Sequence, residues 1–272
     1  MREFSASPHE MLVSLWRNRN LIRVSVEREV LGRYRGSVMG ILWSFFNPLF
    51  MLAVYTIVFS EVFKARWGSG NDSKTEFALV LFAGLMMFNI FAECINRAPG
   101  LILSNANYVK KVVFPLEVLP AITLLAAMFH VLVSLSVWLL AYSLFFGVPH
   151  ATALLLPLIM LPFAMLIMGL SWILASLGVY LRDVSQIISV LTSVLSFMSP
   201  IFYPVSALPE KYRQLLYLNP LTPAIEMTRD VLYWGKMPDI HELGVYWLAT
   251  TLILWLGFVW FQKTRKGFAD VL

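Results

Sequence analysis

Residues 185–204 read SQIISVLTSVLSFMSPIFYP, an apolar run long enough to cross the hydrocarbon core of a bilayer as a helix. Polar side chains recur in it at every third or fourth residue, which places them within roughly 80° of one another on a helix. This hydroxyl stripe consists of Ser185, Ser189, Thr192, Ser196, Ser199 and Tyr203. It is typical of a path for a polar substrate, and equally of helices that pack closely and hydrogen-bond inside a membrane.

The composition of the chain is that of an integral membrane protein. Of its 272 residues, 59% are hydrophobic and only 14% are charged, and the mean hydropathy is +0.73. The net charge of +5 is typical of a membrane protein that retains lysines and arginines on its cytoplasmic side, so we expect no nucleic-acid partner. Cys94 is the single cysteine, which excludes an internal disulfide, and we expect no metal site.

Hydropathy predicts six membrane-spanning helices, on the rule that about 20 apolar residues cross the hydrocarbon core. They cover residues 38–60, 77–95, 116–146, 151–179, 185–204 and 243–261. With both termini in the cytoplasm, 14 of the 21 lysines and arginines lie on the cytoplasmic side, as the positive-inside rule requires. We therefore expect an all-α, multi-pass protein with a cytoplasmic tail and interface helix in residues 1–36 and a transmembrane domain in residues 37–272.

The residues before the first span have an amphipathic pattern. Apolar side chains occupy a sector about 120° wide on a helix and arginines project from the far side. The apolar members are Leu12, Leu15, Trp16, Ile22, Val26 and Val30, and the arginines are Arg17, Arg28 and Arg35. This pattern predicts a helix lying in the cytoplasmic interface of the membrane. Its arginines suit lipid headgroups, and they also suit a partner protein or a phosphorylated substrate.

The loop between the second and third spans, residues 96–114, has the features of a docking surface. Pro99 and Gly100 end the second span. Two apolar patches then flank Asn105 and Asn107; the patches are Leu101, Ile102 and Leu103, and Tyr108, Val109, Val112 and Val113. Apolar side chains in a cytoplasmic loop favour contact with a partner. The alternative is that the loop folds back onto the membrane.

The outer segment between the fifth and sixth spans, residues 205–242, is too long for a simple turn and is rich in proline. Thr222 as N-cap, Pro223 at the first helical position and Glu226 in the first turn, with Gly235 as terminator, predict a short helix on the outer face. Irregular backbone at membrane depth must be shielded by protein or line a water-filled cavity. The segment therefore predicts re-entrant helices that cap a pathway.

Aromatic residues on the first span are placed to contact a sugar. Trp43, Phe46 and Phe50 share a helical face with Asn47, next to a kink predicted at Pro48. Sugar rings pack their C–H faces on aromatic side chains, while their hydroxyl groups need hydrogen bonds. The alternative is ordinary membrane packing or an interfacial aromatic belt.

Motifs for covalent chemistry are absent from the sequence. It contains no G-x-x-x-x-G-K-[ST] phosphate-binding loop and no zinc-protease pattern, so we expect neither nucleotide hydrolysis nor other catalysis in this chain. Within the predicted spans the ionisable residues are few: Glu93, Glu117 and His130. They do not make up a catalytic constellation. His130 suits an interhelical hydrogen bond and, as the alternative, a functional role.

Five motifs, in order along nearly the whole chain, resemble one family. They are Leu42-Trp43 followed by Asn47-Pro48-Leu49, the FPLEVLP of residues 114–120, the LRDV of 181–184, the SPIFYP of 199–204 and the NPLTP of 219–223. In this order they are similar to the membrane subunits of type-2 ABC exporters, in particular those that export lipid-linked O-antigen, capsule or teichoic acid polymers.

The resemblance implies a bacterial inner-membrane homodimer bound to two copies of a separate ATP-binding subunit, which would hold ATP and Mg while this chain holds no cofactor. It implies docking of that subunit through Leu101, Ser104, Asn105, Asn107, Tyr108, Lys110, Lys111, Arg182 and Asp183. It places the first and fifth spans beside the translocation path, which gives a wall of Trp43, Phe46, Asn47, Phe50 and the hydroxyl stripe. Arg28, Arg33 and Arg35 are predicted to meet the lipid diphosphate at the cytoplasmic entrance.

The predicted function is therefore that of a permease subunit that moves a polyprenyl-diphosphate-linked polysaccharide, with O-antigen of lipopolysaccharide as the favoured polymer. Capsule and teichoic acid polymers, or small hydrophobic drugs and lipids, are alternatives within the same fold. A membrane-embedded glycan transferase would need a catalytic constellation that the sequence lacks. A secondary transporter would be expected to show charged midplane sites or inverted repeats.

Overall fold

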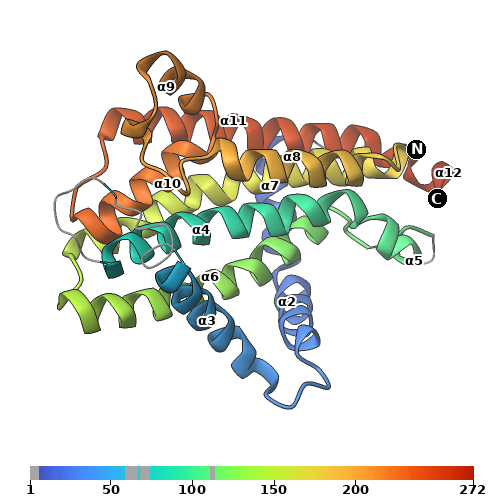
Figure 1. Cartoon of the computed structure of the whole chain (residues 1–272). Coiled ribbons are helices and arrows are strands. Elements are labelled where there is room, and N and C mark those ends of the chain that lie inside the picture. Colours follow the sequence, from blue (N-terminus) through green and yellow to red (C-terminus); the bar gives the residue numbers. More distant parts are fainter. Residues whose placement is uncertain (1–5, 59–66, 68–73, 111–113) are drawn as a thin grey trace.

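The protein is a bundle of long helices with short helical segments at both ends (Figure 1). The computed structural model describes residues 6–58, 67, 74–110 and 114–272, and among these residues there is no strand. The α-helices are α1 Pro8–Arg17, α2 Arg19–Arg33, α3 Trp43–Ile57, α4 Lys74–Arg97, α5 Ala106–Lys110, α6 Val118–Phe146, α7 Leu156–Tyr180, α8 Val184–Met198, α9 Glu210–Tyr217, α10 Leu221–Arg229, α11 Ile240–Thr264 and α12 Phe268–Val271. The shorter turns used below are η3 Ala98–Gly100, η5 Ala151–Leu155 and η7 Asp230–Trp234.

Five helical segments of the described chain are long and apolar enough to cross a membrane. They are Gly40–Ile57, Thr75–Gly100, Val118–Phe146, Ala151–Tyr180 and Ile240–Val271. Each corresponds to a span predicted from hydropathy, although residues 59–60 of the first predicted span lie outside the described residues. The chain is therefore a multi-pass membrane protein.

The remaining predicted span, residues 185–204, is not confirmed as one helix. α8 has 15 residues and ends at Met198, because Ser199 adopts an extended backbone with φ −94° and ψ 149°. A helix of this length is shorter than the about 20 residues that cross the hydrocarbon core. The hydroxyl stripe consequently follows one helical face only from Ser185 to Ser196, and its last two members lie on irregular backbone.

α4 forms the centre of the bundle. It packs against α3, α6, α7, α8 and α10, and its side chains from Phe77 to Phe88 are all buried. A helix that is apolar on every side requires such enclosure. Asn89 is the exception, because its side chain is exposed in the middle of this buried helix.

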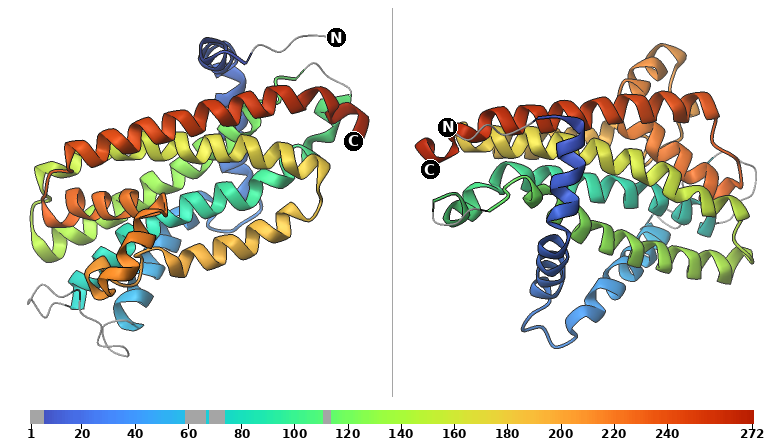
Figure 2. Two further views of the ribbon diagram at one scale, coloured as in Figure 1. Left: turned by 90° about the horizontal axis from the view of Figure 1, so that it is seen from above. Right: turned by 180° about the vertical axis from the view of Figure 1, so that it is seen from behind.

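Residues 8–33 form two helices where the sequence predicted one. α1 ends at Asn18, and α2 then runs across the direction of the bundle (Figures 1 and 2). The predicted apolar sector is thereby divided: Ile22 and Val30 are buried, whereas Trp16 is 72% exposed. The C-terminus lies at the end of the bundle that carries α5 (Figure 1).

The most extensive helix pair, α7 with α11, depends on two glycines. A Cβ atom added to Gly169 would lie 2.5 Å from the carbonyl oxygen of Ile253, and one added to Gly257 would overlap the carbonyl oxygen of Gly169. The two backbones therefore touch, as small residues allow between membrane helices.

We expect Gly257→Ala to destabilise the protein by about 1–3 kcal/mol, the usual effect of overpacking, because backbone atoms cannot move aside as a side chain can. Thermal unfolding of the purified protein in detergent measures the change. Gly244→Ala on the same helix is the control, since nothing lies within 4 Å of its added methyl group. Equal melting temperatures for the two variants would contradict the close contact.

Candidate functional site

Glu117 of the FPLEVLP motif joins four segments at the end of the bundle that holds the C-terminus. Its buried carboxylate accepts hydrogen bonds from Arg265 Nη1 at 2.6 Å and from Ser14 Oγ at 2.7 Å. Its backbone carbonyl accepts one from Trp172 Nε1 at 3.0 Å. The motif therefore fixes α1, the start of α6, α7 and the chain beyond α11 to one another.

A chain of alternating charges ties α2 to α4 nearby. Arg97 lies 2.6 Å from Glu29 and 3.7 Å from Glu93, and Arg33 donates a hydrogen bond to Glu93. Burial opposes the charge on Arg33, but the hydrogen bond and the charge of Glu93 outweigh it, so the pKa of this guanidinium lies above its ordinary value. Arg33 is thus held by a carboxylate of its own chain.

The three arginines predicted at the diphosphate entrance differ in their surroundings. Arg33 is paired as described, while Arg28 and Arg35 are exposed on α2 and just beyond it. Arg28 also lines a cavity of about 270 Å³ between α2 and the loop that follows α4. Leu101, Ser104, Asn105 and Tyr108 line the same cavity, so the structure brings one predicted entrance residue together with four predicted docking residues.

The loop after α4 is anchored to the bundle by its own apolar residues. Leu101 is 8% exposed and Ile102 is fully buried, so the prediction that they form an exposed patch is wrong. The cause is close packing: a Cβ atom on Gly178 of α7 would overlap the carbonyl oxygen of Pro99. Tyr108 stacks on Phe114 with ring centroids 4.4 Å apart.

The exposed residues of the predicted docking set lie at this same end. Asn107 is exposed in α5, and Arg182 and Asp183 are exposed in the turn between α7 and α8. Lys111 and the side chain of Lys110 lie outside the described part of the chain. Docking therefore remains a prediction for a surface that presents mostly polar groups.

A polar cavity of about 230 Å³ lies where α3 meets α4 and α6. Its polar lining includes Asn47, Asn89, Glu93, His130 and Ser134. Polar groups at this depth in a membrane protein require water, a ligand or one another.

His130 belongs to this cavity and contacts a residue that follows α2. Its Nδ1 atom lies 3.4 Å from the Tyr34 hydroxyl oxygen, and the two rings meet edge to face. This contact favours the interpretation of His130 as an interhelical hydrogen-bonding residue.

α3 is loosely packed on the rest of the subunit. Only 11% of its spanning residues are buried, and Trp43 and Phe50 of the predicted path are exposed. Phe46 is half-buried and lies 6.2 Å from Phe50 between ring centroids.

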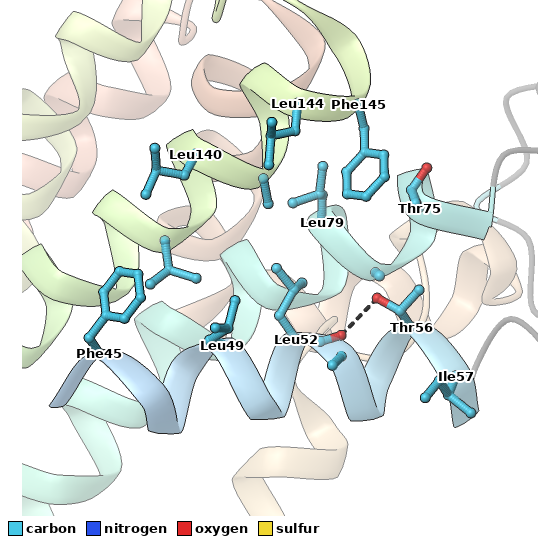
Figure 3. A pocket seen from close by; sticks show the side chains of 14 residues that line it. Phe45, Leu49, Leu52, Thr56, Ile57, Thr75, Leu79, Leu140, Leu144 and Phe145 are labelled. Carbon is cyan, nitrogen blue, oxygen red and sulfur yellow. Dashed lines mark hydrogen bonds between the residues drawn. The ribbon is translucent and has the colours of Figure 1, made fainter. Parts of the chain in front are cut away.

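An apolar groove of about 500 Å³ separates α3 from α6 (Figure 3). Phe45, Leu49 and Leu52 line its α3 side, and Leu140 and Leu144 line its α6 side. α3 therefore contacts its own subunit through a narrow strip of side chains.

Members of the hydroxyl stripe have two different environments. Ser185 and Ser189 are exposed and Ser196 is half-buried. Thr192 is buried and donates hydrogen bonds to Asn96 Oδ1 at 3.1 Å and to its own helix. Thr192 therefore serves helix packing, whereas the path interpretation stays a prediction for the three accessible serines.

The two halves of the predicted wall are not neighbours within one subunit. α3 packs mainly against α4 and α6, whereas α8 packs against α4 and α7. In Figure 1, α8 lies above α4 and α3 lies below it. A path bounded by both surfaces would need a second subunit.

In the outer segment, the predicted N-cap Thr222 is wrong and the predicted terminator Gly235 is confirmed. α10 begins at Leu221, whose N–H donates to Asn219 Oδ1 at 3.0 Å, while Thr222 is buried and does not cap the helix. Gly235 ends the following turn η7 with φ +64°, as predicted. The sequence analysis did not single out Arg229, whose side chain is only 1% exposed. The signal that could have found it is an arginine that follows the apolar residues of α10.

The long apolar helices, with polar cavities between them, are those of a multi-pass membrane protein. The chain belongs to the ABC-2 type transporter family, whose sequence model matches residues 20–233.

Similar proteins cover almost the whole chain. The O-antigen export system permease protein RfbA of Myxococcus xanthus is 27% identical over 94% of this chain and 96% of its own length. RfbA of Klebsiella pneumoniae is 25% identical over 93% and 95%, and the polysialic acid transport protein KpsM of Escherichia coli is 24% identical over 90% and 95%.

We expect Glu117→Ala to destabilise the protein by about 3–5 kcal/mol, because removing one partner of a buried ion pair leaves the other charge uncompensated. The thermal unfolding midpoint in detergent measures this loss. Glu27→Ala is the matched control, since Glu27 and its partner Arg23 are 57% and 80% exposed and such surface pairs contribute about 0–1 kcal/mol. A midpoint for Glu117→Ala equal to that of the control would refute the anchoring role.

Proposed function

We propose that this chain is the permease subunit of an ATP-driven exporter that carries lipid-linked polysaccharide, with O-antigen as the favoured polymer, across the bacterial inner membrane. The observation that carries the proposal is the similarity, over nearly the full length, to permeases of O-antigen export and of polysialic acid transport. The carrier is a polyprenyl diphosphate, for which the exposed Arg28 and Arg35 are available at the cytoplasmic entrance.

The energy comes from a separate subunit that binds ATP and Mg. It docks at the end of the bundle where the C-terminus, the loop after α4 and the turn between α7 and α8 lie together (Figure 1). This end faces the cytoplasm, which agrees with the excess of lysine and arginine on that side. Because Glu117 and the buried Leu101 and Ile102 fix the docking loop to the bundle, a push on the loop moves the helices.

The path runs between two copies of this chain. The exposed side of α3, with Trp43, Asn47 and Phe50, faces the exposed serines of α8 in the other copy. A homodimer covers the thinly packed α3 and supplies the wall that one subunit lacks. Amide, hydroxyl and aromatic groups give a sliding polymer many weak contacts.

Export of a small hydrophobic compound or a lipid is the second candidate. The apolar groove of about 500 Å³ beside α3 favours it, since such a cavity suits an apolar ligand more than a sugar (Figure 3). The two candidates differ in what the cell loses when the gene is removed.

We expect deletion of the gene to abolish surface polysaccharide and to leave lipid-linked polymer in the cytoplasm, with recovery when the gene is restored. Immunoblots of surface and intracellular glycan measure this. The tagged protein is expected to co-purify with an ATP-binding subunit. Normal surface polymer in the deletion strain, together with ATPase stimulation by small amphiphiles, would support the second candidate instead.

We expect the double change Ser189→Leu and Ser196→Leu to block export, because bulky apolar side chains would narrow the α8 wall and remove its hydroxyls. Surface polymer is the readout, with membrane amounts of the protein measured in parallel. The control is Ser136→Leu with Ser143→Leu on α6, whose exposed serines only bond their own helix. Full export by the α8 variant would assign those serines to packing alone.

A further inference from the structure

Arg229 of α10 is buried among backbone carbonyl groups from two other segments. Its Nε donates to the carbonyl of Val80 on α4 at 3.0 Å, and its Nη2 donates to that of Ile201 at 2.7 Å. Its Nη1 donates to the carbonyl of Pro200. The residue is 1% exposed, so the planar guanidinium binds three segments together where water is excluded.

The surroundings of this guanidinium are shaped to hold it. Glu226 accepts a hydrogen bond from Nη1 at 3.0 Å, and the ring of Trp67 lies 4.4 Å from the guanidinium carbon. Gly84 of α4 leaves the space that the group fills, because a Cβ atom there would lie 2.6 Å from Nη2.

Two of the carbonyls that Arg229 binds, those of Pro200 and Ile201, belong to residues that follow the end of α8 at Met198. A helix end carries partial negative charge and unpaired carbonyls, which need partners when lipid surrounds the protein. Asn219, beside α10, donates to Ser199 Oγ at 2.9 Å and approaches the carbonyl of Met198 at 3.5 Å. The outer segment therefore supplies the polar partners that let α8 end inside the bundle.

Separating α10 from the end of α8 would remove two carbonyl acceptors from a buried cation. Desolvated charges without partners are among the most unfavourable arrangements in a protein. By contrast, α3 contains no charged side chain, so movement on its side leaves no buried charge without a partner. These two facts predict which surfaces part during transport.

We infer that Arg229 is a positioning residue that keeps the outer end of α8 joined to α4 and α10 throughout transport. The segment from Ser199 to Gly235 is then not a lid that opens by itself. It moves with α8 as one body, and the path opens between that body and α3 of the other copy. This inference rests on the proposed exporter function.

The first test uses a chain with Cys94→Ala, Met198→Cys and Leu218→Cys, assembled with its ATP-binding subunit. Met198 and Leu218 are 53% and 79% exposed and lie near each other, since Asn219 reaches the Met198 carbonyl. We expect a short bis-maleimide, which adds to both thiols, to join them and polymer export to continue. Loss of export upon cross-linking, or failure of the two thiols to be joined in the resting complex, would overturn the inference.

The second test measures position directly, through the yield of the same cross-link in purified complex. We expect the yield to fall at least several-fold in Arg229→Gln and in Gly84→Ala, whose added methyl displaces the guanidinium, and to recover partly in Arg229→Lys. Gly244→Ala is the control and keeps the full yield. An unchanged yield in both Arg229→Gln and Gly84→Ala would contradict the positioning role.

The two proposals fail in different ways. If the chain does not export polysaccharide, the amount of surface polymer is the same with the parent chain, with any variant and without the chain. The cross-link yields still report on the role of Arg229 in that case. If the parent exports and only the cross-linked form does not, the exporter function stands and the rigid joint is refuted.

Discussion

The interaction on which this structure depends is the coordination of backbone carbonyls by the buried guanidinium of Arg229. Inside a membrane every peptide group needs a partner from the protein, and a helix that stops at Met198 leaves several without one. Next to this end, Arg229 of α10 binds the carbonyls of Pro200 and Ile201, and Asn219, just before α10, donates to Ser199 Oγ. Residues of the SPIFYP and NPLTP motifs thus meet in one joint, and the FPLEVLP motif makes a second joint through Glu117 at the opposite end of the bundle.

These joints divide the subunit into a firm part and a loose part. The firm part consists of α4, α7, α10 and α11, which are joined by glycine contacts and buried charged groups, and the end of α8 is tied to it through Arg229 and Asn219. The loose part is α3, which is largely exposed and lies beside a polar cavity and an apolar groove. The proposed exporter needs both properties. The firm part transmits a movement of the docking end to the other end of the bundle, and the loose part lets the path widen.

The sequence alone predicted the elements whose cause is local. Continuous apolar runs gave five spans, and Gly235 was recognised as a terminator because only glycine adopts its backbone conformation easily. The errors arose where distant residues decide. Leu101 and Ile102 were predicted to contact a partner, but both are buried within the subunit. The hydroxyl stripe was predicted to continue past Met198 because the sequence does not reveal that Arg229, thirty positions after Ser199, binds the irregular backbone there. The wall residues of α3 and α8 were chosen by pattern, and one subunit does not bring them together.

The shortness of α8 has a consequence for how the protein is made. A translocon releases helices into lipid according to their own hydrophobicity, and an arginine within a candidate segment opposes release by roughly 2.5–3.5 kcal/mol. When residues 184–198 leave the ribosome, Asn219 and Arg229, which bind the chain at and just beyond the end of α8, have not yet been synthesised. We therefore expect the fifth segment to complete its insertion only together with α10, as a hairpin. Truncation between the two halves is then expected to leave α8 without a stable place in the bilayer.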